Sequence, residues 1–234
     1  MGDLFKVSST GGEAQSLTRH TAHDFMPVWS NDGSKIAFAS DRFGNYDISV
    51  VYNGFRFPER EDSGPFNEND SAEILTIGLV GRIEKEKGAL DFIELAYRLR
   101  DIDQLRFRFV GECRSPVLMN QILNEVKKLG IDQKIEFTGL IGSVDKCYEG
   151  LNMVLNLSKI RESFGRTIVE AAMYGLPALS YKNGGPEEII EHELTGELAD
   201  NLVDIEKSIR KLFNQPELMR KYSKTAYDRA LHRF

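Results

Sequence analysis

The chain has 234 residues, of which 41% are hydrophobic and 28% charged, and its formal net charge is −6. These values are typical of a soluble globular protein with one large or two smaller domains, and they argue against a general nucleic-acid binder. No apolar run approaches the roughly 20 residues that a membrane-spanning helix needs. Cys113 and Cys147 lack metal-type spacing. We therefore expect reduced thiols, no bound metal and a cytoplasmic protein.

Residues 1–48 consist of short alternating runs separated by turn residues, without a helical period. Asp32-Gly33 precedes the alternating run Lys35–Ser40, and Asp-Gly beside such a run is a strong hairpin signal. The stretch from Pro27 to Arg42, followed by Gly44–Ile48, resembles one repeat of the WD40-like propellers of the TolB and tricorn type.

Propellers need about 4–8 such repeats, and we find one. We expect this copy to pack on the following domain, to pair with another chain or to stay partly disordered. Its large aromatic residues are interpreted as packing residues rather than a binding platform; they are Trp29, Phe38 and Tyr46.

From Ile74 onward, strand and helix patterns alternate. Ile74–Val80 is a continuous apolar run, which is typical of a strand buried on both faces of a parallel sheet. Helical periods cover 90–99 and 116–129, and further strands are expected at 105–110, 135–137, 153–157 and 178–181. This alternation predicts an α/β fold with a Rossmann-like, doubly wound parallel sheet.

We place a propeller-like antiparallel β segment at 1–48 and the Rossmann-like domain at 49–234. The strand at Ile48–Tyr52 is expected to join the parallel sheet. Residues 59–73 combine acidic residues with Ser, Gly, Pro and Asn, and they read as a solvated loop.

Glu162 and Glu170 flank a predicted helix start near Gly165. The first N–H groups of a helix bind anions, and carboxylates accept hydrogen bonds from hydroxyls, so the segment suits a ligand with phosphates and hydroxyls. The alternative is an ordinary amphipathic helix with two solvated glutamates. Glycine and polar or charged residues also follow the other predicted strands. Ligands of such sheets bind at these carboxyl ends of the strands. These segments are Gly81-Arg82, Gly111-Glu112, Thr138-Gly139, Ser158–Glu162 and Asn183–Gly185.

Several motifs occur in a characteristic order between residues 50 and 234. They are Tyr52–Gly54, Gly81-Arg82, Lys87-Gly88, Glu162–Gly165, Glu170-Ala171, Gly175–Pro177, Gly184–Ile189 and Thr195-Gly196. Together they resemble the C-terminal, donor-binding half of a GT-B fold glycosyltransferase of family 4. The resemblance implies a UDP- or GDP-sugar as donor substrate and a retaining, metal-independent transfer.

The resemblance also implies roles for single residues. Arg82 and Lys87 would hold the diphosphate and stabilise it as leaving group, and Glu162 would face the donor sugar; these three are the expected catalytic residues. Glu170 would accept hydrogen bonds from the ribose, and the base would lie against the loop 138–143. The donor-binding set is Arg82, Lys87, Gly111, Ser163, Phe164, Gly165, Arg166, Thr167 and Glu170. The alternative for Arg82 and Lys87 is a pair of solvated loop charges.

The chain departs from the family pattern at three positions. Leu157 stands where a proline is usual, Arg166 where the residue is commonly apolar, and Arg56 where an acidic residue often follows Asn-Gly. These departures concern the donor assignment rather than the fold. The segment 1–48 does not resemble the acceptor-binding half of a GT-B enzyme, which predicts little or no turnover by this chain alone and suggests a fragment or a chimera.

Two other functions stay open at this point. One is a non-enzymatic fold that joins segments of unrelated proteins. The other is an interaction module, in which residues 1–48 offer strand edges to a partner or to a second copy of the chain. We expect no nucleic-acid partner and no membrane-spanning segment.

Overall fold

The computed structural model describes residues 4–6, 15–18, 24–29, 35–40, 47–52, 74–162 and 164–233. The chain divides into two compact units, Met1–Phe55 with Phe234 and Arg56–Arg233. The boundary predicted between residues 48 and 49 stays a prediction. The predicted loop at 59–73 lies outside the described residues. Across the described ranges, no helix has both the length and the apolar character needed to cross a membrane.

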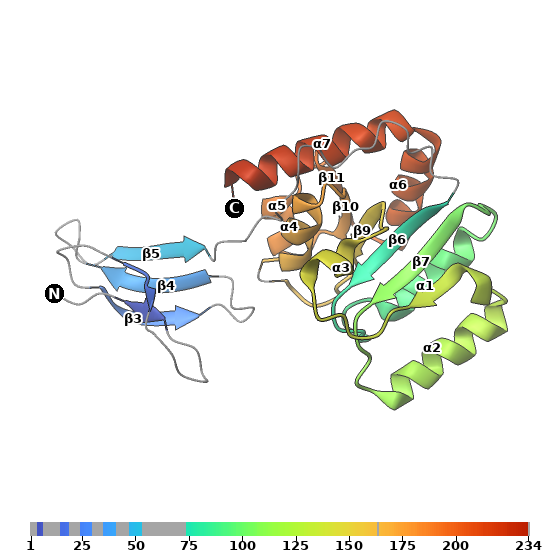
Figure 1. Cartoon of the computed structure of the whole chain (residues 1–234), viewed down its shortest axis with the longest axis horizontal. Helices are drawn as coiled ribbons and strands as arrows, with labels where there is room; N and C mark the ends of the chain where they lie inside the picture. The colour runs from blue at the N-terminus through green and yellow to red at the C-terminus, as the bar shows by residue number, and fades with distance from the viewer. Residues whose placement is uncertain are drawn as a thin grey trace. The chain divides into compact units, whose positions relative to one another are not determined.

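The described strands of the first unit form two small antiparallel sheets, and Figure 1 labels the strands of the larger one. One pairs β1 with β2, and the other has the order β3-β4-β5. The strands are β1 (Phe5–Lys6), β2 (Gln15–Ser16), β3 (Asp24–Trp29), β4 (Lys35–Ser40) and β5 (Asp47–Tyr52).

The prediction that Ile48–Tyr52 joins the parallel sheet is wrong. Strand β5 pairs with β4 over its whole length, from Tyr52 opposite Lys35 to Asp47 opposite Ser40. The physical reason is the connection: an antiparallel neighbour needs only a short turn, whereas a parallel partner requires a long crossover.

A small apolar cluster lies in the first unit. Leu4, Ile36 and Phe38 are buried together, and the Leu4 N–H donates a hydrogen bond to Thr18 Oγ1 at 3.0 Å. Phe38 is therefore a packing residue, as predicted. The side chain of Trp29 and all of Tyr46 lie outside the described part of the chain.

The second unit is built on a six-stranded sheet whose neighbouring strands are all parallel. Its order is β8-β7-β6-β9-β10-β11, so the chain starts in the middle, moves to one edge, and continues from β9 to the other edge. This is the strand order of a dinucleotide-binding sheet. The strands are β6 (Leu75–Val80), β7 (Leu105–Val110), β8 (Ile135–Phe137), β9 (Met153–Asn156), β10 (Ala178–Tyr181) and β11 (Gly196–Ala199).

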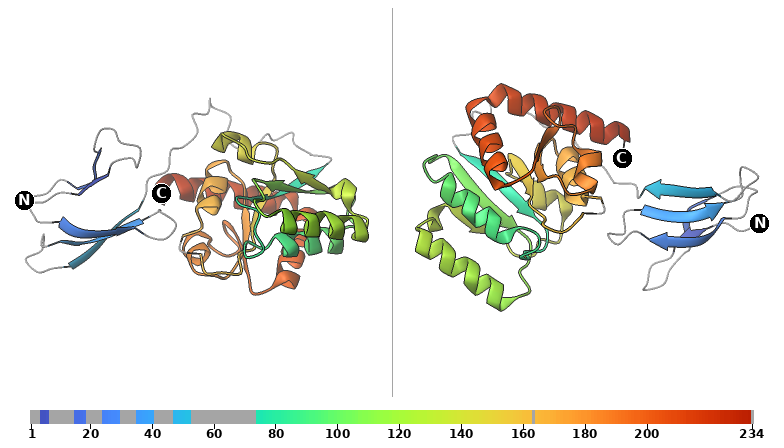
Figure 2. Two further views of the ribbon diagram at one scale, coloured as in Figure 1. Left: turned by 90° about the horizontal axis from the view of Figure 1, so that it is seen from below. Right: turned by 180° about the vertical axis from the view of Figure 1, so that it is seen from behind.

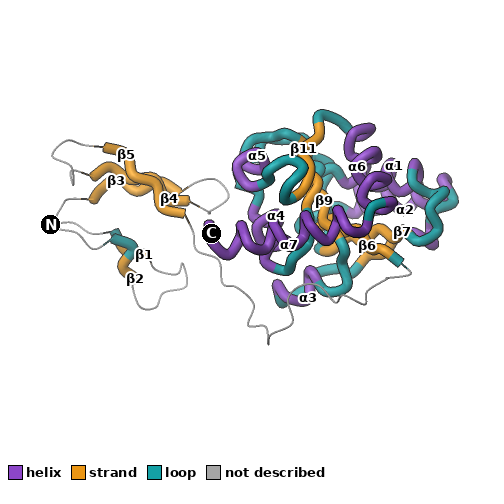
Figure 3. Tube along the Cα trace, turned by 90° about the horizontal axis from the view of Figure 1, so that it is seen from above, coloured by secondary structure: helices purple, strands orange, loops and turns teal. Residues whose placement is uncertain are grey.

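Helices cover both faces of this sheet (Figure 2). One face carries α1 (Ala89–Arg98), α2 (Pro116–Leu129) and α6 (Leu202–Asn214), and the other carries α3 (Val144–Tyr148) and α4 (Arg166–Met173). The short α5 (Gly185–Ile189) contacts α4. The last helix, α7 (Pro216–Arg233), lies alongside α4 and contacts β11 (Figure 3).

The larger core of this unit is packed around aromatic side chains. The ring of Phe92 on α1 meets Phe107 and Phe109 of β7 edge-on, with centroids 5.3 and 4.8 Å apart. Phe109 also stacks on Phe137 of β8 at 5.0 Å. Edge-on and offset contacts are the favoured geometries of aromatic pairs. They attach α1 to β7, the neighbour of β6 in the sheet, and the loop after β6 contributes to the candidate site.

The doubly wound, Rossmann-like fold class is confirmed. The predicted strands at 105–110, 135–137 and 178–181 and the predicted helix at 116–129 have the observed bounds. That helix begins after Ser115, whose hydroxyl accepts the Leu118 N–H at 3.3 Å, and it ends at Gly130 in the left-handed conformation.

Candidate functional site

The loops after β6 and β9 meet where the strand order of the sheet reverses. Ligands of open α/β sheets bind at the carboxyl ends of the strands at such a position. Gly88 has φ 82°, and a Cβ there would lie 2.3 Å from the carbonyl oxygen of Leu157. The Lys159 N–H donates a hydrogen bond to the Glu86 carbonyl at 2.7 Å. The two loops therefore pack backbone against backbone.

Asp91, in the first turn of α1, joins the same region through its side chain. Its carboxylate contacts Lys159 Nζ at 2.7 Å and accepts a hydrogen bond from the Tyr181 hydroxyl at 2.8 Å. Burial and the nearby Asp91 charge raise the pKa of Tyr181, so this hydroxyl stays a donor at neutral pH. One carboxylate thus holds together α1, the loop after β9 and the end of β10.

Lys87 and Glu162 form an ion pair across the two loops. Their side chains are 30% and 15% exposed, so the pair is partly withdrawn from water but still reachable. The backbone of Glu162 is held as well: its N–H donates to the Asn183 carbonyl at 3.0 Å, and its carbonyl accepts the Gly185 N–H at 2.7 Å. The sequence analysis names Lys87 and Glu162 as residues of one site, and in the structure their side chains are in contact.

The turn at Gly184-Gly185 provides this backbone support. A Cβ on Gly185 would lie 2.2 Å from the Phe164 carbonyl oxygen, so only glycine allows the close approach. The Gly184 N–H donates to Glu187 Oε1 at 3.0 Å, which closes the start of α5. The turn therefore lies beside Glu162.

Helix α4 begins at Arg166, with Gly165 before it at φ 92°, close to the predicted start. Glu170 lies in its second turn and has two partners. Arg166 Nε contacts Glu170 Oε1 at 2.8 Å, and the Tyr148 hydroxyl donates to Oε2 at 2.8 Å. The side chain of Glu170 is 15% exposed. The alternative of two solvated glutamates on an ordinary helix therefore does not describe Glu162 or Glu170.

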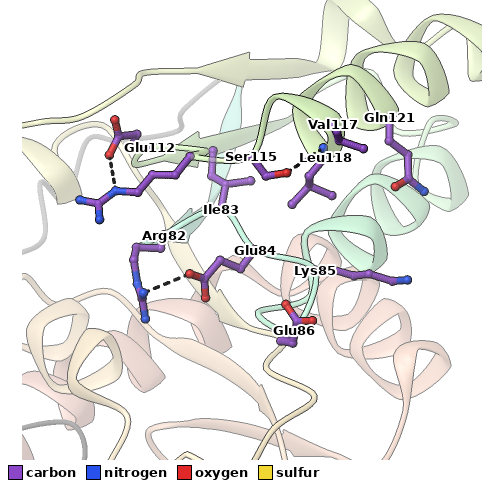
Figure 4. Close-up of a pocket in the computed structure, with 11 residues that line it drawn as sticks. Arg82, Ile83, Glu84, Lys85, Glu86, Glu112, Ser115, Val117, Leu118 and Gln121 are labelled. Carbon is purple, nitrogen blue, oxygen red and sulfur yellow. Dashed lines mark hydrogen bonds and ion pairs between the residues drawn. The ribbon is translucent and has the colours of Figure 1, made fainter.

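Arg82 lies differently. It is 66% exposed, and its Nη1 contacts Glu84 Oε1 at 3.1 Å. It borders an open hollow of about 500 Å³ between its loop and the start of α2 (Figure 4). The hollow is lined by Arg82, Ile83, Glu84, Lys85, Glu86, Glu112, Arg114, Ser115, Val117, Leu118 and Gln121. This lining includes neither Lys87 nor the two predicted glutamates.

The remaining predicted residues of the donor-binding set differ in burial and in their contacts. Gly111 has φ 142°, and a Cβ there would lie 1.9 Å from the Gly81 carbonyl oxygen, so its local role is close backbone packing between the ends of β6 and β7. Phe164 is buried. Thr167 lies in the first turn of α4, where its carbonyl is 3.4 Å from the Tyr148 hydroxyl. Ser163 lies outside the described residues.

The structure thus joins Lys87 to Glu162 and Arg166 to Glu170, and it pairs Arg82 with Glu84 instead. Two residues were missed by the sequence interpretation: Tyr148, which contacts Glu170, and Asp91, which contacts Lys159. A tyrosine in a five-residue helix and an aspartate in the first turn of a helix are ordinary features. No signal in the local sequence distinguishes them.

With this geometry established, comparison with known proteins identifies the family. The chain belongs to the glycosyl transferases group 1 family, which matches residues 61–229. The 2-deoxystreptamine N-acetyl-D-glucosaminyltransferase of Niallia circulans is 30% identical over 174 residues, which are 72% of this chain and 41% of that protein. The N-acetyl-alpha-D-glucosaminyl L-malate synthase of Bacillus anthracis is 25% identical over 199 residues, 81% and 50% of the two chains. The chain therefore spans half or less of the length of these relatives.

Solved structures agree with the family assignment. The C-terminal domain of the group 1 glycosyl transferase LpcC from Francisella tularensis has a TM-score of 0.63 and 28% identity, and the match covers 68% of this chain and 85% of that one. Anabaena HepE in complex with UDP and glucose has a TM-score of 0.66 at 23% identity, covering 70% and 45%. The second unit is accordingly a glycosyltransferase domain of the GT-B type.

Proposed function

We propose that the second unit binds the diphosphate of a UDP-sugar donor at Lys87 and the N-terminus of α4, with the ribose at Glu170. The observation that carries this proposal is the Lys87–Glu162 ion pair at the reversal of strand order. Group 1 family membership and the UDP and glucose complex of the similar HepE structure support this choice of ligand.

The charges at the site suit such a ligand. A diphosphate would compete with Glu162 for Lys87, because phosphate oxygens are strong acceptors for an ammonium group. Glu162 would then be free to accept hydrogen bonds from the hydroxyls of the donor sugar. Lys87 would also stabilise the negative charge that grows on the diphosphate as it leaves. Arg82 can join from its exposed position, since surface ion pairs such as Arg82–Glu84 are weak.

The proposed reaction of this site is glycosyl transfer with retention of the anomeric configuration. The bond from the sugar to the diphosphate breaks, a bond to an acceptor oxygen forms, and the acceptor proton passes to the leaving diphosphate or to water. The family resemblance of the Glu162–Glu170 segment supports retention. Metal independence and low turnover by this chain alone stay predictions, and measuring transfer to added acceptors, with and without a chelator, would test both.

Thermal unfolding of the full chain with nucleotides tests donor binding. UDP at 100 times its Kd is expected to stabilise the fold by about 2.7 kcal/mol, and uridine at the same concentration is expected to stabilise it much less because it lacks the diphosphate. For a domain of this size, that corresponds to a rise in Tm of roughly 5–10 °C. GDP is the parallel arm that identifies the base. An unchanged Tm with millimolar UDP and GDP, and no heat of binding in calorimetry, would reject the proposal.

The N-terminal unit carries a separate, smaller proposal. Its described strands β3-β4-β5 form an antiparallel sheet, as one propeller-like repeat would, which supports that resemblance. We propose that strand edges of this unit pair with a second copy of the chain. A dimer in sedimentation velocity that is lost on removing residues 1–55 supports this, and a clean monomer contradicts it. That the chain joins segments of unrelated proteins stays a prediction.

A further inference from the structure

Tyr148 connects the short helix α3 to the proposed ribose carboxylate. Its side chain is buried, with 3% of the residue exposed, and its hydroxyl donates to Glu170 Oε2 at 2.8 Å. The ring stacks on Tyr174 just after α4, with centroids 5.1 Å apart and planes 14° apart. The Tyr174 hydroxyl in turn contacts Asp145 of α3. The end of α3 is therefore fastened to α4 by two tyrosines, and one of them touches Glu170.

The two oxygens of Glu170 are held in different ways. Oε1 faces Arg166, whose side chain is 59% exposed and lies one turn earlier on the same helix. Exposed pairs at this spacing are weak and easily exchanged. Oε2 faces the buried hydroxyl of Tyr148, and a hydrogen bond to a charged acceptor in a buried place is among the stronger ones. A ligand can therefore displace Arg166 from Oε1 while Tyr148 keeps the carboxylate in place.

The Tyr148 hydroxyl remains a donor under all ordinary conditions. Burial, together with the nearby negative charge of Glu170, raises the pKa of Tyr148. A protonated hydroxyl can only satisfy Glu170 Oε2 by donating to it. The other oxygen, Oε1, can then accept a ligand hydroxyl once the ligand displaces Arg166.

We propose that Tyr148 is a positioning residue that fixes Glu170 for the ribose hydroxyls of the nucleotide. This inference rests on the proposed function and deepens it. Because α3 directly follows the loop 138–143, where the base is expected, Tyr148 also couples the base-binding loop to the ribose contact. Ribose recognition then depends on a residue that does not touch the ribose.

The test compares UDP with 2′,3′-dideoxy-UDP, in the full chain and in Tyr148→Phe. Wild type is expected to prefer UDP, because Glu170 accepts hydrogen bonds from the ribose hydroxyls. Tyr148→Phe is expected to bind UDP about tenfold more weakly in calorimetry, whereas the affinity for the dideoxy nucleotide changes less than about twofold. In a Glu170→Gln background, Tyr148→Phe is expected to leave the ratio of the two affinities unchanged.

Tyr222→Phe is a matched control. Tyr222 is 1% exposed and donates to Glu197 Oε1 at 3.2 Å. Tyr222→Phe therefore also removes a buried hydrogen bond to a carboxylate, but in a different hydrophobic cluster from that of Tyr148. Phenylalanine keeps the ring volume at both positions, so both variants are expected to fold, and their Tm values check this. An equal loss for UDP and dideoxy-UDP, or no loss for either, overturns this inference alone. Wild type that binds neither nucleotide overturns the proposed function as well.

Discussion

Replacing Lys87 by methionine is expected to lower the affinity for UDP by about 100-fold, which corresponds to about 2.7 kcal/mol. Two effects add. The diphosphate loses a charged hydrogen-bond donor, which alone is worth about 1.5–3 kcal/mol. Glu162, which is only 15% exposed and has lost its cation, then opposes the approach of the diphosphate. Methionine replaces the apolar stem of lysine and lacks the ammonium group, so the packing of the loop is preserved.

Calorimetric titration with UDP measures the effect, and Lys85→Met is the matched control. Lys85 lies two positions earlier in the same loop, is exposed, and borders the hollow of Figure 4 rather than contacting Glu162. Its replacement is expected to change the affinity less than about twofold, because exposed charges are screened by salt. The double variant Lys87→Met with Glu162→Gln is expected to recover part of the loss. Equal losses of UDP affinity in Lys87→Met and Lys85→Met would indicate a general charge effect and contradict a specific role for Lys87.

The fold of the second unit could be predicted from the sequence because short strand-like runs alternate with helical periods. Leu105–Val110 and Ala178–Tyr181 are bounded by turn residues, and Ser115, Pro116 and Gly130 mark both ends of α2. The sequence of a strand does not determine which other strand it pairs with. Strand β5 has the composition of a sheet strand, and only its pairing with β4 places it in the first unit.

The candidate site could be predicted in part for the same reason. Glu162, Glu170 and Lys87 stand out by type and spacing, but the contact between Lys87 and Glu162 depends on β6 and β9 being neighbours in the sheet. Tyr148 lies opposite Glu170 only because α3 packs against α4, and local spacing does not report that packing. Arg82 was expected beside Lys87, yet the side chain pairs with Glu84 of its own loop.

Gly88→Ala is expected to destabilise the second unit by about 3 kcal/mol or more, which lowers its Tm by roughly 6–12 °C. An L residue is strained at the φ of 82° found here, and the added Cβ would lie 2.3 Å from the Leu157 carbonyl oxygen. That carbonyl cannot move away cheaply, because Lys159, two residues later, is hydrogen-bonded to Glu86 and ion-paired with Asp91. Any relief must push the loops after β6 and β9 apart, which also separates Lys87 from Glu162.

Gly130→Ala isolates the effect of the close approach. Gly130 also has a positive φ, 66°, but a Cβ there would meet open space, so only the backbone strain of about 1–2 kcal/mol is expected. Calorimetric unfolding of both variants should therefore give a clearly larger fall in Tm for Gly88→Ala. At temperatures where both variants are folded, only Gly88→Ala should bind UDP more weakly than wild type. Equal falls in Tm would contradict the added cost of the close approach. Unchanged UDP binding in Gly88→Ala would mean that the contact between the two loops does not position Lys87.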